Sequence, residues 1–221
     1  MRSLIFDIDG TLWDSRALVA EGYNIQLKQE GYHHLCVDAE VLRPLFGKVM
    51  TEIADAILAE VPVPQRYDLM ERCMETENRY LYENECKIGY EGVKETLELL
   101  AQDYRLFIVS NAQCGYPELC MEKLGLTQLI EGHLCFGDTG TEKGETILTL
   151  MRRYQIEDAV YIGDTQGDYE ATVVANIPFI WAAYGFGSPE GAAGRITDIR
   201  QLPETLKALY IENFNRKEVI L

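Results

Sequence analysis

The sequence predicts an α/β fold in which a Rossmann-like parallel sheet flanked by helices forms the core, with an inserted α-helical cap domain. Two observations lead to this fold class. After residue 89, short apolar segments alternate with amphipathic segments, which indicates strands joined by crossover helices. Between residues 15 and 86 only helical patterns occur, so this stretch reads as an insertion. We therefore expect a core of residues 1–14 and 87–221 and a helical cap of residues 15–86.

The N-terminal part begins with a buried strand and continues with helices. Residues 3–8 (SLIFDI) are mostly apolar and form the first predicted strand. In the inserted stretch, apolar and polar residues interleave at helical spacing over 15–31 and 65–84. Asp38 and Thr51 are residue types that cap helices, so each is a candidate for the start of a further helix.

The C-terminal part alternates between the two kinds of element. Helices are predicted at 92–102, 116–124, 143–154 and 167–175, and strands at 105–111, 133–138, 159–165 and 177–183. This alternation predicts parallel strands joined by crossover helices. The last segment, 208–221, has apolar residues to which we assign no element; it either packs on the core or forms a dimer contact.

The composition restricts the partners of the protein. Among its 221 residues, 36 are acidic and 20 basic, and the formal net charge of −16 makes nucleic acid an unfavourable partner. No apolar run approaches the roughly 18 residues that a membrane-spanning helix needs, so no membrane partner is expected. Asp7 and Asp9 interrupt the apolar N-terminus, unlike a signal peptide. The six cysteines lack CxxC spacing, which favours reduced thiols and a cytoplasmic protein.

Polar side chains follow three of the predicted strands, at the point where each strand ends. Asp7 and Asp9 follow the first strand, Ser110 and Asn111 end the second, and Asp164 ends the fourth. Ligands of open parallel sheets bind beyond the carboxyl ends of the strands. The sequence therefore predicts one site at this edge of the sheet.

The residue types at this edge suit phosphoryl transfer. The site would contain four carboxylates, from Asp7, Asp9, Asp164 and Asp168. Such a cluster is costly unless a cation neutralises it, and Mg²⁺ prefers carboxylate and phosphate oxygens. Ser110, Asn111 and Lys143 offer a hydroxyl, an amide and an ammonium, which can surround phosphate oxygens. A metal, a carboxylate nucleophile and a cationic cradle together favour phosphoryl transfer.

Four motifs, taken in order, resemble those of the haloacid dehalogenase superfamily in its phosphatase branch. They are DIDGT (7–11), Ser110 with Asn111, Lys143, and GDTQGD (163–168). The helical insertion after DIDGT resembles the cap of the subgroup that contains phosphoglycolate phosphatases and β-phosphoglucomutases. The motifs span residues 7–168, and the α/β pattern covers nearly the whole chain.

The resemblance implies a role for each matching residue. Asp7 matches the nucleophile that forms an aspartyl-phosphate, and Asp9 matches the acid that protonates the leaving group and then activates water. The implied Mg²⁺ ligands are the side chains of Asp7 and Asp164 and the backbone carbonyl of Asp9, with Asp168 in support. The implied phosphate contacts are Ser110, Lys143, Asn111 and backbone amides near Gly10, while Thr11 orders the loop.

A segment of the insertion resembles the loop that reaches the active site in this subgroup. In LRPLFGKVMTEI (42–53), Gly47 would provide a turn and Lys48 would meet the non-reacting part of an anionic substrate. The alternative for Lys48 is an exposed lysine at the start of a helix.

The expected function is a Mg²⁺-dependent phosphatase that hydrolyses a small phosphorylated metabolite. One alternative is a phosphomutase of the β-phosphoglucomutase type, which would share all four motifs. A second alternative is a binding or regulatory protein that kept the fold without catalysis. The substrate and the choice between monomer and homodimer stay open, because fold-level likeness does not determine them.

Overall fold

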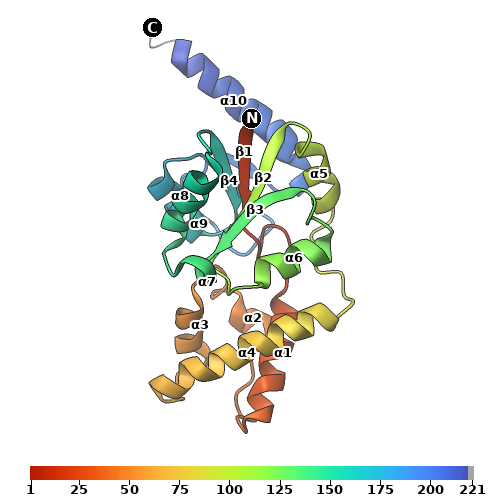
Figure 1. Cartoon of the computed structure of the whole chain (residues 1–221), viewed down its shortest axis with the longest axis vertical. Helices are drawn as coiled ribbons and strands as arrows, with labels where there is room; N and C mark the ends of the chain where they lie inside the picture. Colours follow the sequence, from red (N-terminus) through yellow and green to blue (C-terminus); the bar gives the residue numbers. More distant parts are fainter. Residues whose placement is uncertain (219–221) are drawn as a thin grey trace.

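The computed structural model, which describes the backbone of residues 1–218 and the side chains of residues 1–210, is built around one six-stranded sheet. The strands are β1 (Arg2–Phe6), β2 (Tyr104–Ser110), β3 (Ile130–Cys135), β4 (Ala159–Gly163), β5 (Phe179–Ala182) and β6 (Gly194–Ile196). Their order is β3-β2-β1-β4-β5-β6, and every neighbouring pair is parallel. The first strand therefore lies inside the sheet, between β2 and β4 (Figure 1). The predicted fold class is confirmed.

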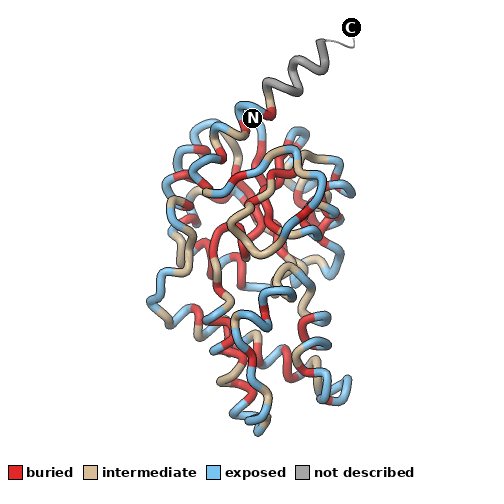
Figure 2. The backbone as a smooth tube through the Cα atoms, turned by 180° about the vertical axis from the view of Figure 1, so that it is seen from behind, coloured by how far each residue is buried: buried red, intermediate tan, exposed pale blue. Residues whose placement is uncertain are grey.

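Helices cover both faces of this sheet. They are α5 (Val93–Leu100), α6 (Tyr116–Leu124), α7 (Phe136–Thr139), α8 (Lys143–Tyr154), α9 (Gln166–Ala175), the 3-10 turn η1 (Ile199–Gln201) and α10 (Leu202–Glu218). Leu4 and Phe6 of β1 belong to the same apolar cluster as Leu97 of α5, whereas Ile5 belongs to the cluster that contains Ile147 of α8. Successive strand residues point to opposite faces, so a strand covered on both faces needs a continuous apolar run. Figure 2 shows the resulting band of buried residues through the sheet.

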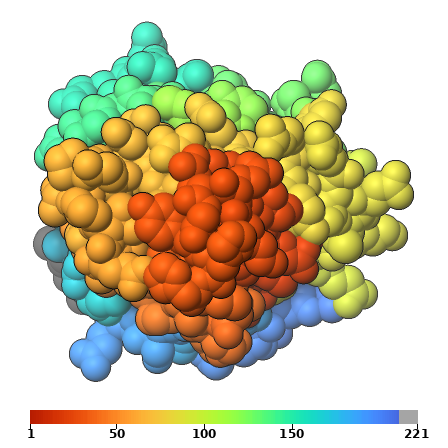
Figure 3. Space-filling view, turned by 90° about the horizontal axis from the view of Figure 1, so that it is seen from below, coloured from red at the N-terminus to blue at the C-terminus, as the bar shows by residue number. Residues whose placement is uncertain are grey.

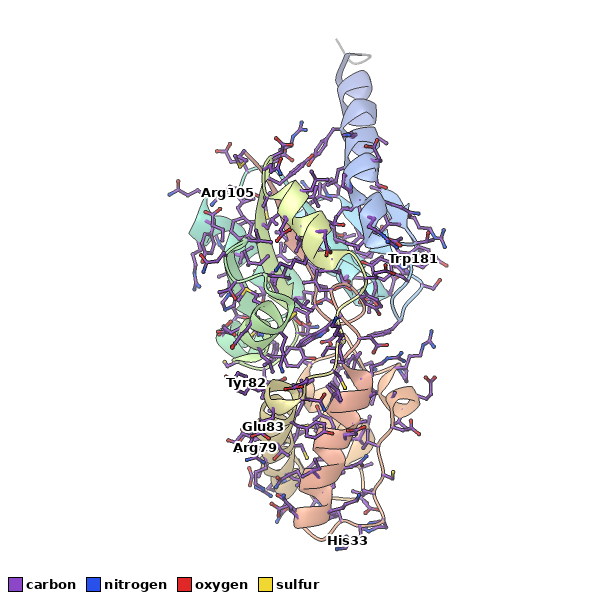
Figure 4. The ribbon with its side chains drawn as sticks, turned by 90° about the vertical axis from the view of Figure 1, so that its right-hand side faces the viewer. His33, Arg79, Tyr82, Glu83, Arg105 and Trp181 are labelled. Carbon is purple, nitrogen blue, oxygen red and sulfur yellow. The ribbon has the colours of Figure 1, made fainter. Side chains whose placement is uncertain are left out.

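Between β1 and α5 the chain forms four helices, which we call the helical block (residues 16–83). They are α1 (Arg16–Gln29), α2 (Ala39–Leu42), α3 (Met50–Ile57) and α4 (Val63–Glu83). The block lies beyond one edge of the sheet, with His33 at its far end and Tyr82 next to the core (Figures 1 and 4). Helices α1 and α4 approach closely at Gly22, where a Cβ atom would lie 2.8 Å from the Cα of Glu77. A larger residue there would push the two helices apart.

The chain leaves and re-enters the core through two neighbouring connections. Trp13, on the outgoing connection, forms an antiparallel β-bridge with Gly89 on the returning one. The amide of Asp14 also donates to the carbonyl of Ile88 at 2.9 Å. The two connections are therefore held together by backbone hydrogen bonds where the helical block joins the core.

Most predicted elements occur within a few residues of their expected bounds, and the helices at 116–124 and 143–154 match fully. The strand predicted at 133–138 is displaced, because β3 ends at Cys135 and residues 136–139 turn into α7. Asp138 causes this change of direction, since its side chain accepts the backbone N–H of Cys135 at 2.8 Å.

The two candidate helix caps differ in outcome. Asp38 caps α2, and its carboxylate accepts the amides of Glu40 and Val41. The prediction for Thr51 was wrong, because α3 already begins at Met50 and its preceding residue makes no side-chain cap. The residue before the helix, Val49, has an apolar side chain that cannot accept a backbone N–H, so the helix begins without a side-chain cap.

The C-terminal region contains elements that the sequence pattern did not reveal. Strand β6 has three residues, too few to show a period of two. Residues 208–218 continue α10, and Leu209 is buried against the core. The side chains of 211–221 and the backbone of 219–221, which belong to the unassigned segment 208–221, lie outside the described residues. In the described part of the chain, no helix is long and apolar enough to cross a membrane.

Candidate active site

The predicted site residues gather at the edge of the sheet that faces the helical block. Asp7 follows the end of β1, Ser110 is the last residue of β2, and Asp164 follows the end of β4. Because β1 lies between β2 and β4, their carboxyl ends meet at one place. Lys143 joins them as the first residue of α8. From below, the helices of the block cover much of this face (Figure 3).

A buried ion-pair network lies at the centre of the site. The Nζ of Lys143 donates to Oδ1 of Asp7 at 2.9 Å and to Oδ1 of Asp168 at 2.6 Å. The exposed fractions of these residues are 5%, 2% and 0%. Burial would lower the pKa of Lys143, but the charges of Asp168 and Asp7 raise it above its ordinary value. The ammonium is therefore firmly charged and fixes both carboxylates.

Asp168 is already saturated with hydrogen bonds. Its Oδ2 accepts the amides of Asp164 and Thr165 at 3.1 and 2.9 Å and the Thr165 hydroxyl at 2.7 Å. Burial acts to raise its pKa, but Lys143 and the Thr165 donors hold the pKa below its ordinary value. The geometry suits an acid that orients Lys143 and the loop before α9, rather than one with an open ligand position.

Asp164 has an oxygen that lacks a partner. Its Oδ2 accepts the amide of Phe186 at 2.6 Å, while its buried Oδ1 has no hydrogen-bond partner among the described residues. Burial and the charges of Asp168 and Asp7 raise its pKa well above the ordinary value. The backbone of Gly10 lies close to the Asp164 carboxylate. A Cβ atom added to Gly10, whose φ is +81°, would lie 2.3 Å from Oδ2 of Asp164. Glycine is needed there for both space and conformation.

These features fit a hard divalent cation. Carboxylate oxygens of Asp7, Asp164 and Asp168 lie within 4.8 Å of one another. Three buried carboxylates face one lysine, and burial followed by the charge of Asp168 raises the pKa of Asp7 to about 7 despite Lys143. A cation would supply the missing partner of Asp164 Oδ1 and neutralise the excess charge. The side chain of Asp9 is outside this group, so its expected contribution through the backbone carbonyl stays a prediction.

The Asp9 carboxylate is held by three donors that converge on one oxygen. Oδ1 accepts the indole N–H of Trp13 at 2.8 Å, the hydroxyl of Ser15 at 2.7 Å and the hydroxyl of Tyr116 at 2.9 Å. Burial raises the pKa of Asp9 to about 6, and the three hydrogen bonds limit the rise. Sequence reasoning missed Ser15 and Tyr116. Ser15 could have been found, because it follows Asp9 closely in the sequence and carries a hydroxyl donor. Tyr116 could not, because it comes from the distant helix α6.

The remaining predicted residues lie around this centre. Asn111 donates from Nδ2 to the carbonyl of Gly47 at 2.7 Å, which links the core to the helical block. The hydroxyl of Ser110 accepts the amide of Ala112 at 3.3 Å. The Gly10 amide donates to the carbonyl of Trp13 at 2.9 Å, and the Thr11 carbonyl accepts the hydroxyl of Tyr184 at 2.8 Å, so both hold the loop in shape.

A small cavity of about 30 Å³ lies between the core and the helical block. Its polar walls include Asp7, Asp9, Ser110, Asn111, Gln113 and Tyr116 from the core and Tyr23, Lys48 and Glu77 from the block. The structure thus brings Lys48 and Gly47 to the site, with Lys48 largely exposed.

Glu77 is a wall residue that sequence reasoning missed. Burial raises its pKa to about 8; the Asp9 charge adds to the rise, whereas hydrogen bonding to Tyr23 and Gln113 lowers the pKa. A signal existed, because Glu77 follows the buried Leu69 and Cys73 at intervals of four residues, on the inward face of α4. A charged residue on such a face is unusual and marks a candidate site.

Comparisons with known proteins agree with this geometry. The family described as haloacid dehalogenase-like hydrolase matches residues 4–182. Phosphoglycolate phosphatase of Xanthomonas campestris pv. campestris (strain 8004) is 28% identical over 198 residues, covering 84% of each chain. Pyrophosphatase PpaX of Listeria monocytogenes serotype 4a (strain HCC23) is 26% identical over 197 residues, covering 86% of this chain and 87% of its own.

A solved structure extends the comparison to the fold. A predicted phosphatase from Clostridium acetobutylicum superposes with a TM-score of 0.79 at 20% identity, covering 94% of this chain and 98% of that one. At this identity the likeness concerns the fold alone. The family match spans most of the chain and all four motifs. The chain therefore belongs to the haloacid dehalogenase-like hydrolase family, in its phosphatase branch.

Proposed function

We propose that this enzyme is a Mg²⁺-dependent phosphatase that hydrolyses a small-molecule phosphate monoester through an aspartyl-phosphate on Asp7. The observation that carries the proposal is the buried Asp7–Lys143–Asp168 network. It lies beside Oδ1 of Asp164, which has no hydrogen-bond partner in the described part of the chain. Phosphatases of this family generally use a divalent metal. Phosphoryl transfer depends mainly on positioning and on neutralising charge, and this site supplies both.

Asp7 is the proposed nucleophile. Its Oδ1 is engaged by Lys143 at 2.9 Å, which leaves Oδ2 as the attacking oxygen. Attack forms a bond from Oδ2 to phosphorus and breaks the bond between phosphorus and the ester oxygen. In the second step water attacks the same phosphorus, the bond to Oδ2 breaks, and phosphate leaves with Asp7 regenerated.

Asp9 is the proposed acid and base. It gives a proton to the departing alcohol oxygen and then takes one from the attacking water, so protons balance over the cycle. A pKa of about 6 leaves both protonation states accessible near neutral pH. The donors Trp13, Ser15 and Tyr116 all use Oδ1, so Oδ2 is the oxygen we assign to proton transfer.

The proposed Mg²⁺ ligands are the side chains of Asp7 and Asp164 and the backbone carbonyl of Asp9, with Asp168 acting through water. Carboxylate and carbonyl oxygens are the ligands that Mg²⁺ prefers. When bound, the ion would neutralise charge on the transferring phosphoryl group. Asp168 would mainly keep Lys143 in place.

Ser110, Asn111 and Lys143 are the proposed phosphate contacts, with backbone amides near Gly10 assisting. Ser110 is buried at the end of β2, and Asn111 follows it at the cavity wall. A hydroxyl, an amide and an ammonium together can satisfy the oxygens of a bound phosphoryl group.

The helical block is proposed to act as a cap, corresponding to an insertion of residues 15–86 into a core of residues 1–14 and 87–221. The cavity between the core and the helical block is small, about 30 Å³. We expect the cap to move away when a phosphate ester enters and then to close and exclude water. Proposed partners are small phosphorylated metabolites in the cytoplasm, and phosphoglycolate and pyrophosphate are candidates from the names of the relatives.

The test is phosphate release from a panel of small phosphate monoesters, with Mg²⁺ or with EDTA, by wild type and Asp7→Asn. We expect metal-dependent release that Asp7→Asn abolishes, while the matched control Asp103→Asn at an exposed position behaves as wild type. Retention of most activity in folded Asp7→Asn would overturn the mechanism. Fast isomerisation of a hexose phosphate with slow phosphate release would indicate a phosphomutase, and tight partner binding without turnover a regulatory protein.

A further inference from the structure

We propose that Glu77 selects the substrate by accepting a hydrogen bond from a hydroxyl or ammonium group on the alcohol part of the ester. This inference rests on the proposed phosphatase reaction and names the substrate class of the same site: phosphate monoesters of small polyols or amino alcohols. The residue lies on α4 of the helical block, whereas the reacting groups lie on the core. Both line the same cavity.

Glu77 is buried without sufficient partners. Its exposed fraction is 3%. Its Oε1 accepts one long hydrogen bond, 3.4 Å from Nε2 of Gln113. Its Oε2 is buried, and in residues 1–210 no atom makes a well-formed hydrogen bond to it; the hydroxyl of Tyr23 is near enough to lower the pKa of Glu77 without completing such a bond. Leaving a buried carboxyl oxygen without a donor is unfavourable, so a ligand that supplies one would be bound preferentially.

The position of Glu77 is fixed by its surroundings. Gly22 of α1 allows α4 to approach, since a Cβ atom there would lie 2.8 Å from the Cα of Glu77. The adjacent Thr76 donates to Oε1 of Gln26 at 2.8 Å, which ties α4 to α1 on the same turn. The carboxyl group is therefore held at the cavity wall by helix packing, as a preorganised binding group requires.

The charges around the cavity favour a donor over a carboxylate at this place. Asp9 already acts on Glu77 as a neighbouring negative charge. The carboxylate of a substrate such as 2-phosphoglycolate offers Oε2 no donor and adds negative charge beside Asp9. A hydroxyl or ammonium would instead satisfy Oε2. Lys48 also lines the cavity but is largely exposed, so its charge is better screened than that of Glu77.

Four esters of matched size test the inference. They are 2-hydroxyethyl phosphate, 2-aminoethyl phosphate, propyl phosphate and 2-phosphoglycolate, measured for kcat/KM with Mg²⁺. We expect wild type to prefer at least one of the first two over the last two by about tenfold or more, because a site built for a donor rejects substrates that lack it. The relative rates of the first two distinguish a polyol from an amino alcohol.

Variants connect the preference to this side chain. Glu77→Leu removes the acceptor, and we expect the preference over propyl phosphate to fall about tenfold or more. Glu77→Gln keeps an acceptor without charge, and it should retain more of the preference for 2-hydroxyethyl than for 2-aminoethyl phosphate. The matched control is Glu75→Gln, an exposed glutamate on the same helix, which should leave the preference as in wild type.

A stability measurement separates binding from structure. If Glu77 serves a ligand, Glu77→Leu should unfold at the same or a higher temperature than wild type, since it removes an underpaired buried carboxyl. A lower unfolding temperature with unchanged ester preference would show a structural role and overturn the inference. Equal hydrolysis of all four esters by wild type would also overturn it while leaving the proposed phosphatase intact. Absence of hydrolysis of any phosphate ester would overturn both.

Discussion

Replacing Lys143 by methionine tests whether one ammonium holds the buried acids together. Methionine has nearly the same length but no charge. The change would leave Asp7, Asp164 and Asp168, whose oxygens lie within 4.8 Å, without the only cation that this network contains in the described structure. Breaking a buried ion pair in this way typically costs about 3–5 kcal/mol. For a domain of this size, that corresponds to a fall in unfolding temperature on the order of 10 °C.

The assay is thermal unfolding followed by circular dichroism, first in EDTA and then in excess Mg²⁺. We expect the destabilisation of Lys143→Met in EDTA, and partial recovery with Mg²⁺, because the ion can take over part of the neutralising role. The matched control is Lys207→Met, which removes an exposed lysine paired with Glu204 and should change little.

Two results would refute this reasoning. Equal stability of wild type and Lys143→Met in EDTA would mean that the acids are protonated or hydrated and do not need the lysine. A large loss in Lys207→Met would mean that surface charge, rather than the buried network, governs the stability of this strongly acidic protein.

Three further predictions concern the same site. Asp164→Asn should weaken Mg²⁺ binding about 10-fold or more, measured from the Mg²⁺ dependence of the unfolding temperature. In EDTA the same variant should be more stable than wild type, because a buried carboxylate is removed. An unchanged Mg²⁺ dependence would exclude Asp164 as a ligand. Tyr116→Phe removes a donor that lowers the pKa of Asp9. The alkaline limb of the pH profile of kcat/KM should therefore move to higher pH by roughly half a unit to one unit. A shift to lower pH would contradict the assignment of Asp9 as the acid. In EDTA, stability should fall as pH rises from about 4 to 7, because folded Asp7, with its pKa near 7, holds a proton that the unfolded chain has already lost; Mg²⁺ should flatten this slope, and a rise in stability over this range would contradict the raised pKa.

The sequence was informative where chemistry and strand ends coincide. Asp7, Ser110 and Asp164 follow apolar runs, and the parallel arrangement brings them together as expected. The sequence also predicted Lys143 as a site residue. Its pairing with Asp168 was not predicted, because that contact depends on the approach of α8 to α9 and no local sequence pattern indicates it.

The parts that escaped prediction depend on long-range packing. Tyr116 reaches Asp9 across 107 positions of the chain. Glu77 reaches the site because α4 packs closely on α1 at Gly22, a contact between two separate helices. Strand β6 pairs with β5 over three residues, where backbone pairing with an existing edge matters more than local preference.

The paired connections between the helical block and the core have a consequence for the proton chemistry. Trp13 is bridged to Gly89 through its backbone while its indole donates to Asp9, and Ser15, which also donates to Asp9, immediately precedes α1. Two of the three donors to Asp9 are thus parts of the joint on which the block would swing. Rotation at this joint is expected to stretch those hydrogen bonds and raise the proton affinity of Asp9, so that the acid keeps the proton it has taken from water. An enzyme so built would hold its acid in the protonated form each time it opens to exchange product for substrate.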